Sequence, residues 1–258
     1  MLKGIDISKW NNWQERFKDY DFIMIRAMGT GGKDSKLDSH FNALAGNASG
    51  KPLPDKCYGF YCFPDVTKSA IDEADEFLSY VGHHAGHAMF ALDWEGSALS
   101  GGVNWALAWL NRVYERTGVK PLIYGSASEL AQAKYKVIHD NDYGLWVAHW
   151  TNASSPNAGH WGSYWAIWQY TSNNGTLDEN WFNGSADAWH KFCNPGNTST
   201  VKPSQPVESK TYYTVQSGDN LTKIAKKFNT TVNAIVALNP GKITDPDYIQ
   251  TGWYIRVL

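Results

Sequence analysis

Residues 88–95 read Ala-Met-Phe-Ala-Leu-Asp-Trp-Glu, an apolar run that ends in two carboxylates separated by one tryptophan. The run predicts a buried strand that emerges at the edge of a core, because a strand this apolar is normally covered on both faces. Side chains alternate along a strand, so Asp93 and Glu95 are expected on one side and Trp94 on the other.

Two acids this close repel each other when both are ionised, which raises the pKa of one and leaves a proton donor beside an anion. That pair suits glycosidic bond cleavage, in which an acid protonates the leaving oxygen and a carboxylate supports the developing positive charge or activates water. The alternative is an acidic strand end that leads into a solvated loop.

Further short apolar strands surround this one, and several are separated by segments with helical periodicity. The predicted strands are Gly4–Ser8, Phe22–Ala27, Cys57–Phe63, Ala88–Glu95, Leu122–Gly125, Leu145–His149, Trp165–Tyr170 and Thr176–Asp178. Helical faces are formed by Ile71, Ala74, Phe77, Leu78 and Val81, and by Val103, Leu107, Leu110 and Tyr114. Alternation of strand and helix predicts parallel βα units and an α/β fold, here an irregular TIM-like βα barrel.

Polar side chains recur at the ends of these strands. They are Asp6, Arg26, Tyr61, Asp93, Glu95, Tyr124, Gln169 and Asp178. In a parallel barrel the carboxyl ends of the strands form one face, so these residues are expected to converge there. Any single one of them could be a surface residue, but their recurrence at the strand ends favours a shared site.

The chain is predicted to hold two domains joined by a linker. Residues 1–193 form the barrel, 194–210 form a Pro/Ser/Thr-rich linker, and 211–258 form a small βααβ unit. In the βααβ unit, Asn220 and Thr231 are positioned to cap two short helices.

Five fragments of the larger domain resemble glycoside hydrolase family 25, the Chalaropsis-type lysozymes common among phage endolysins. They are Gly4–Ser8, Gly59–Phe63, Leu92–Glu95, Leu145–His149 and Trp168–Tyr170. The resemblance implies cleavage of the β-1,4 bond between N-acetylmuramic acid and N-acetylglucosamine. It makes Glu95 the general acid and places Asp93, Asp6 and Asp178 around the cleavage site, although the family's Asp-Leu-Asn is Asp178-Glu179-Asn180 here.

The substrate cleft is expected to be lined by Tyr61, Tyr124, Trp146 and Trp168, with Arg26 and Gln169 as further binding residues. Two completions of the reaction stay open. Asp93 orients the substrate's own 2-acetamido group as an internal nucleophile, or Asp6 or Asp178 activates water directly.

Residues 212–258 resemble a LysM module, a binder of glycans that contain N-acetylglucosamine. The resemblance implies sugar contacts by Gly218, Asp219, Asn220, Leu221 and Asn239. The same residues are also suited to form turns and helix caps, so a structural role is the alternative.

Composition and charge exclude some classes of function. The net charge of −2 argues against a nucleic-acid-binding protein. The chain has three cysteines, Cys57, Cys62 and Cys193, an odd number without the spacing of metal ligands. We therefore predict that they are free buried thiols of a protein made in a reducing cytoplasm; a Cys57–Cys62 disulfide is the alternative. No signal-peptide core and no membrane span are expected, so a holin would have to open the way to the wall.

Three other motifs are set aside. The stretch His83–His87 lacks a carboxylate partner at metal-site spacing, Gly29–Gly32 lacks the spacing of a phosphate loop, and Ser126 lacks the second glycine of a nucleophile elbow. We therefore predict no metal and no cofactor.

The sequence thus predicts a monomeric, wall-anchored muramidase of the endolysin type, with cytolytic and antimicrobial action on bacterial peptidoglycan. The competing hypothesis is a non-catalytic peptidoglycan-binding protein that keeps the barrel as a scaffold.

Overall fold

The computed structural model describes residues 1–11, 14–53, 55–171, 177–195, 212–228, 230–239, 242–243 and 245–257. The chain divides into two compact units, Met1–Thr198 and Ser199–Leu258. The predicted linker 194–210 lies outside the described residues except for Asn194 and Pro195. The domain bounds given above therefore stay predictions.

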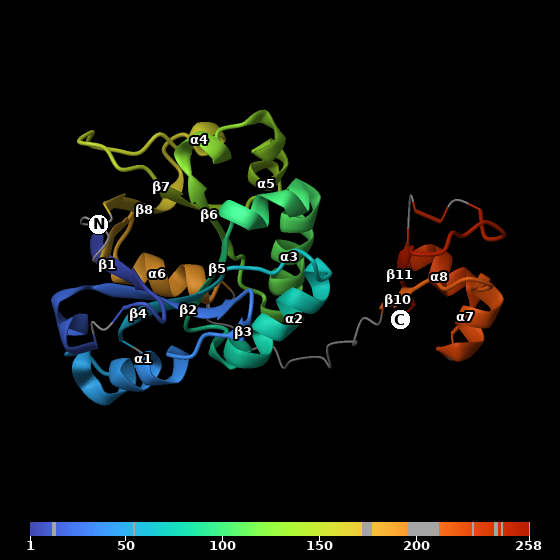
Figure 1. Cartoon of the computed structure of the whole chain (residues 1–258), viewed down its shortest axis with the longest axis horizontal. Helices are drawn as coiled ribbons and strands as arrows, with labels where there is room; N and C mark the ends of the chain where they lie inside the picture. Colours follow the sequence, from blue (N-terminus) through green and yellow to red (C-terminus); the bar gives the residue numbers. More distant parts are fainter. Residues whose placement is uncertain are drawn as a thin grey trace. The chain divides into compact units, whose positions relative to one another are not determined.

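The larger unit is a closed βα barrel, as predicted (Figure 1). Its strands are β1 (Leu2–Ile7), β2 (Phe22–Gly29), β4 (Cys57–Cys62), β5 (Met89–Asp93), β6 (Leu122–Ser126), β7 (Gly144–Ala148), β8 (Trp165–Thr171) and β9 (Asp178–Phe182). Each strand pairs with the next one named here, and β9 returns to β1, which closes the ring. The short strand β3 (Gly32–Lys33) forms a hairpin with β2.

The last strand of the barrel corrects the prediction. Seven strands run parallel, but β9 is antiparallel to both of its neighbours, β8 and β1. It begins at Asp178, where the predicted strand Thr176–Asp178 was expected to end, and Thr176 itself lies outside the described residues. The connection from β8 is too short for a crossover helix, so the chain turns back on itself.

Helices lie along the outside of the barrel. They are α1 (Leu37–Ala43), α2 (Ala70–Val81), α3 (Gly102–Thr117), α4 (Ala127–Leu130) and α5 (Lys136–Asp140). The last helix of this unit, α6 (Ala186–Cys193), instead packs against the inner side of the strands through Trp189 and Cys193. The two predicted helices are present as α2 and α3, which pack side by side (Figure 1). The predicted face of α2 is largely buried, but that of α3 was only partly right, since Leu110 is buried whereas Tyr114 is 42% exposed. Ser69 caps α2 by accepting a hydrogen bond from the Asp72 amide, and Gly118 ends α3 at a φ of +72°.

The strands are apolar on both faces because each face contacts a different core. The outer cluster lies between strands and helices and includes Ile23, Phe90 and Trp109. The inner cluster fills the barrel; there α6 contributes Trp189 and Cys193. Cys57, Cys62 and Cys193 are all buried with free thiols.

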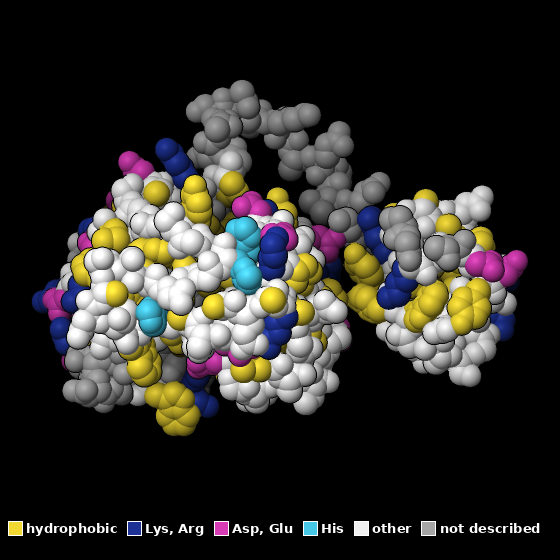
Figure 2. Space-filling view, turned by 90° about the horizontal axis from the view of Figure 1, so that it is seen from above, with side chains coloured by type: hydrophobic (Ala, Val, Ile, Leu, Met, Phe, Trp, Pro, Cys, Tyr) yellow, Lys and Arg dark blue, Asp and Glu magenta, His cyan; other side chains and the backbone are white. Residues whose placement is uncertain are grey.

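The smaller unit has the predicted βααβ order. Its elements are β10 (Tyr212–Thr214), α7 (Leu221–Lys227), α8 (Val232–Leu238) and β11 (Tyr254–Arg256), and the two strands pair antiparallel. Asn220 and Thr231 cap the two helices as expected. Hydrophobic and basic side chains share the visible face of this unit (Figure 2). Within the described parts of both units, no helix combines the length and apolar character that a membrane span needs.

Candidate active site

The carboxyl ends of the parallel strands bring the predicted polar residues to one end of the barrel. Strand register sets Asp93 beside Tyr124 and Arg26 beside Tyr61. Asp6, at the end of β1, is paired with Asp178 at the start of β9. Because β9 is antiparallel, its first residue lies at the same end as the last residues of its neighbours, which is how Asp178 reaches this face.

Asp6 is held by a buried chain of hydrogen bonds. Its Oδ2 accepts from Gln169 Nε2 at 3.0 Å and from Asn180 Nδ2 at 2.7 Å. Gln169 Oε1 in turn accepts from the Tyr124 hydroxyl at 3.1 Å, and Asn180 Oδ1 accepts from Trp146 Nε1 at 2.8 Å. The amides are therefore oriented by aromatic donors, and the Asp6 carboxyl has a fixed position.

Burial and mutual repulsion raise the pKa values of these acids. Burial and the charge of Asp178 raise the pKa of Asp6 to about 8, although its two amide donors act in the opposite direction. The pKa of Asp93 lies well above its ordinary value because of burial and then the charges of Glu95 and Asp6. Among the described residues, Asp93 Oδ1 is buried without a hydrogen-bond partner.

Glu95 is more accessible than the two aspartates. It follows β5 and is exposed, whereas Asp93 is only 8% exposed. Partial desolvation and the charge of Asp178 raise the pKa of Glu95, and desolvation raises that of Asp178. Between Glu95 and Asp93, Trp94 points the other way, as predicted, into the outer core, where its Nε1 donates to the Tyr135 hydroxyl at 2.9 Å.

Arg26 brings a cation to this acidic end. Its Nε donates to Asp34 Oδ2 at 2.7 Å, which fixes the guanidinium, and its charge lowers the pKa of Asp93 against the effect of burial. The sequence analysis did not include Asp34, which follows β3 and is 4% exposed.

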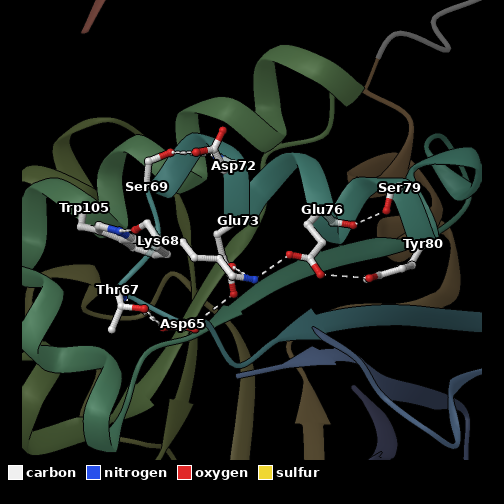
Figure 3. A network of polar contacts seen from close by, with 10 residues as sticks. All are labelled: Asp65, Thr67, Lys68, Ser69, Asp72, Glu73, Glu76, Ser79, Tyr80 and Trp105. Carbon is white, nitrogen blue, oxygen red and sulfur yellow. Dashed lines mark hydrogen bonds and ion pairs between the residues drawn. The ribbon is translucent and has the colours of Figure 1, made fainter. Parts of the chain in front are cut away.

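The turn that carries Glu95 rests on the loop after β4. A 3-10 helix, Gly96–Gly101, begins directly after Glu95, and at its last residue, Gly101, a Cβ atom would lie 2.9 Å from Val66 of this loop. Figure 3 shows how the loop is tied down: buried Glu73 accepts from the Asp65 amide at 2.7 Å, and Lys68 Nζ contacts Glu76 at 2.8 Å. This network holds the loop that lies against the end of the 3-10 helix after Glu95.

Three of the four predicted cleft aromatics come together inside the barrel. The ring of Trp146 lies 5.7 Å from that of Tyr61 and 4.8 Å from that of Tyr124, centroid to centroid. The placement of Trp168 corrects the prediction: it packs in the outer core, and its Nε1 donates to the His149 carbonyl at 2.8 Å. Gln169 faces inward to Asp6, so alternation along β8 turns its neighbour Trp168 outward.

Sequence reasoning missed Asn180 and Trp150. Asn180 lies two residues after Asp178 in β9, so the period of a strand puts both on one face, a signal that was available once Asp178 had been chosen. Trp150 is 63% exposed, and its Nε1 donates to Gln169 Oε1 at 3.3 Å. A cavity of about 460 Å³ beside it is also lined by Glu95 and Tyr124, so Trp150 offers a ring face near the acid.

The motifs set aside have structural roles. Ser126 caps α4 by accepting from the Glu129 amide, and Gly29 and Gly32 pair in the hairpin of β2 and β3. The His84 ring lies 4.5 Å from that of Phe41, and burial lowers the pKa of His84 to about 4. Over the ranges described, no group of His, Cys, Asp and Glu side chains has the arrangement of a metal site.

The predicted sugar-binding residues of the smaller unit maintain its shape. Asp219 Oδ2 accepts from the Tyr213 hydroxyl and the Gln216 amide, both at 2.8 Å, and Asn220 caps α7. Asn239 Nδ2 donates to the carbonyls of Ile235 and Arg256. Gly218 has a φ of +84°, and Leu221 lies in the core. Contact of these five residues with a sugar stays a prediction.

Comparisons with known proteins agree with this geometry. The family "Glycosyl hydrolases family 25" matches residues 5–178, and the LysM domain matches residues 213–257. The lysozyme of Streptomyces coelicolor is 26% identical with a TM-score of 0.61, over 75% of this chain and 97% of that one. The catalytic domain of endolysin ply40 from bacteriophage P40 of Listeria monocytogenes is 25% identical with a TM-score of 0.53, over 75% and 97%.

A phage protein matches more strongly over a shorter stretch. The endolysin of Bacillus phage PZA is 52% identical over 63 residues, which are 24% of this chain and 23% of that protein. The chain therefore matches about a quarter of the length of this relative, and this match by itself shows similarity over that stretch alone.

Proposed function

The chain belongs to glycosyl hydrolase family 25, and on that premise we propose that it is a muramidase. Its barrel would cleave the β-1,4 bond between N-acetylmuramic acid and N-acetylglucosamine in peptidoglycan, while its LysM domain holds the enzyme on the wall. Two weak sites on one chain raise the local concentration of each, which matters on an insoluble polymer.

The observation that carries the proposal is the set of four acids at one end of the barrel. Asp6, Asp93, Glu95 and Asp178 all have raised pKa values, and Arg26 is the cation that acts on Asp93. Raised pKa values favour the protonated form, so such a group can donate a proton to a leaving oxygen and still present negative charge to a sugar cation.

In this mechanism Glu95 donates its proton to the glycosidic oxygen, because it is more exposed than Asp93, the acid that ends β5, and its pKa is raised. Asp93 is buried, and no side chain or backbone group of the described residues bonds its Oδ1, which leaves this atom suited to orient the 2-acetamido group of the substrate. Asp6 is a poor base near neutral pH, since its pKa of about 8 keeps it protonated. Direct activation of water is therefore assigned to Asp178 if the acetamido group does not act.

The two completions differ in product configuration. Attack by the acetamido group followed by water retains the configuration at the anomeric carbon, whereas direct attack by water inverts it. Proton NMR of the first product formed from a soluble glycan distinguishes them within minutes of mixing, before mutarotation. We expect retention, with Asp93 as the orienting group.

The biological role we propose is that of a phage or prophage endolysin, a monomer that acts at the wall after a holin has opened the membrane. The likenesses to the endolysins of Bacillus phage PZA and bacteriophage P40 support it. Expression in a susceptible host with and without a holin tests it, because lysis should require both proteins. Lysis of the host by the chain alone would contradict this role.

The decisive experiment for the reaction is digestion of purified peptidoglycan followed by identification of the new reducing sugar. Wild type should produce muramic acid ends, and Glu95→Gln should not. Glu15→Gln, the same change at an exposed site, serves as control and should behave as wild type. New glucosamine ends would assign a different bond, and wall binding without any new ends would support the non-catalytic alternative.

A further inference from the structure

A second cavity, of about 600 Å³, opens at the amino-terminal end of the barrel, opposite the acidic site. It lies beside Gly144, the first residue of β7, and Ala166, the second residue of β8. Five of its lining residues are aromatic: Tyr114, Tyr143, Trp161, Tyr164 and Phe192. None of these residues takes part in the proposed reaction, so the cavity needs a separate explanation.

The floor of this cavity is rigid. Trp161 and Tyr143 are each 3% exposed, and Trp161 Nε1 donates to the Tyr143 carbonyl at 2.8 Å. The Tyr143 hydroxyl donates to Asn111 Oδ1 at 2.5 Å, and the His139 ring packs edge-on against Trp161 with centroids 5.7 Å apart. A floor with its polar groups already paired costs little to organise when a ligand binds.

The rim, in contrast, presents flat rings and charges to solvent. Tyr164 is 84% exposed and Tyr114 is 42% exposed, unusual values for large aromatic side chains. Lys120 Nζ lies 5.6 Å from the centre of the Tyr114 ring and 2.8 Å from Asp142 Oδ2. Apolar faces beside a few charged groups match the chemistry of a sugar, which has apolar C–H faces and a polar edge.

We propose that this cavity is a second binding site for the N-acetylated glycan strand of peptidoglycan, with Tyr114 and Tyr164 stacking on sugar rings. The inference rests on the proposed function, since it takes the same polymer as ligand. This site would bind the wall independently of both the cleft and the LysM domain. On an insoluble polymer an additional binding site raises the avidity of the enzyme for its substrate without altering the cleavage reaction.

An alternative occupant is the part of the chain that follows Pro195, which lines the same cavity. Residues 196–211 contain no aromatic residue and only two valines and two prolines as apolar side chains of any size. They offer little to five aromatic rings, whereas the N-acetylated sugars offer C–H faces and methyl groups. The glycan is therefore the better match.

Photocrosslinking tests the site directly. The full chain carrying Glu95→Gln, which should leave the glycan uncut, is mixed with N-acetylglucosamine tetramer that bears a diazirine, irradiated, digested and mapped by mass spectrometry. We expect labels on the peptides that contain Tyr114 and Tyr164, in addition to labels in the acidic cleft. The Tyr114→Ala/Tyr164→Ala pair should lose only the former, and Tyr114→Phe/Tyr164→Phe should keep both because the ring faces remain.

The outcomes separate this inference from the proposed function. Cleft labels without cavity labels would overturn the second site alone, and absence of both would overturn the two together. Cavity labels that arise only after residues 196–211 are replaced by a Gly/Ser sequence would identify the chain itself as the occupant and also overturn the inference.

A kinetic comparison gives an independent readout. Each stacked ring contributes about 0.5–1.5 kcal/mol, and loss of two rings should make the double alanine variant clear insoluble walls about 5- to 150-fold more slowly, since about 1.4 kcal/mol corresponds to tenfold. Its rate on a soluble tetrasaccharide should equal that of wild type, because that substrate is too short to reach both ends of the barrel. Equal loss on both substrates would show a general structural defect and contradict a binding role.

Discussion

Replacing Asp6 by asparagine should stabilise the barrel near neutral pH. The Asp6 carboxyl is 7% exposed, with a pKa of about 8 against an ordinary value of 3.8. A raised folded-state pKa contributes stability that is complete below the unfolded value and is lost as pH rises toward the folded value. At pH 7 the folded chain must therefore hold a proton that the unfolded chain has released.

That proton uptake costs at most about 4 kcal/mol at pH 7, because each pH unit above the unfolded pKa costs about 1.4 kcal/mol. Sharing of protons among the four acids reduces the cost, so we expect Asp6→Asn to gain about 1–3 kcal/mol. The asparagine Oδ1 can still accept from Gln169 and Asn180, which preserves the network. For a domain of this size the gain corresponds to a rise in Tm of about 3–10 °C.

Thermal unfolding followed by tryptophan emission measures the effect, since twelve of the 13 tryptophans lie before residue 190 and so report on the barrel. The gain should be present at pH 7 and vanish near pH 3.5, where Asp6 is protonated in both states. Asp55→Asn, at an exposed aspartate, is the matched control and should change the free energy of unfolding by less than about 0.5 kcal/mol. A destabilised Asp6→Asn, or a gain that persists at pH 3.5, would refute the reasoning.

Three further predictions concern positions outside the acids. Lys56→Met should lower the free energy of unfolding by about 2–4 kcal/mol in a urea titration, because buried Lys56 Nζ donates to the carbonyls of Phe17 and Tyr20; an unchanged midpoint would contradict it. Gly59→Ala should cost about 1–3 kcal/mol, since its Cβ would lie 2.5 Å from Met24 Sδ and 2.8 Å from the Met89 carbonyl, and normal stability would show that β4 adapts. Asn239→Ala should release the chain from walls and abolish a separate melting step of the LysM domain, whereas lost binding with intact melting would show direct sugar contact.

Much of the barrel could be predicted because its strands are buried on both faces. The runs around Ile23, Phe90 and Ile123 are apolar without alternation, and strong helical periods separate several of them. The reversal at β9 could not be predicted, since strand direction depends on whether the connection has room for a crossover helix. Sequence pattern shows where a strand lies but not which way it runs.

The sequence predicted which acids lie at the site better than it predicted which residues contact them. Asp6, Asp93, Glu95 and Asp178 meet as expected, because all lie at one end of the barrel strands. The hydrogen bonds that hold Asp6 could not be predicted, since Asn180, which donates to Asp6, and Trp146, which donates to Asn180, lie far from it in sequence. Strand register and closure of the barrel bring these residues together. Trp168 was misplaced because a tryptophan has the same sequence signature in an outer core as in a cleft.

The account depends most on Glu95 as the proton donor, and a substrate with a better leaving group tests that role. Glu95→Gln should lower kcat on wall polymer by about 100- to 10,000-fold, the usual contribution of a general acid. On a 2,4-dinitrophenyl glycoside of the disaccharide, whose leaving group needs no proton, the same variant should remain within about 10-fold of wild type. Equal losses on the two substrates, or no loss on either, would contradict the assignment of Glu95 as the general acid.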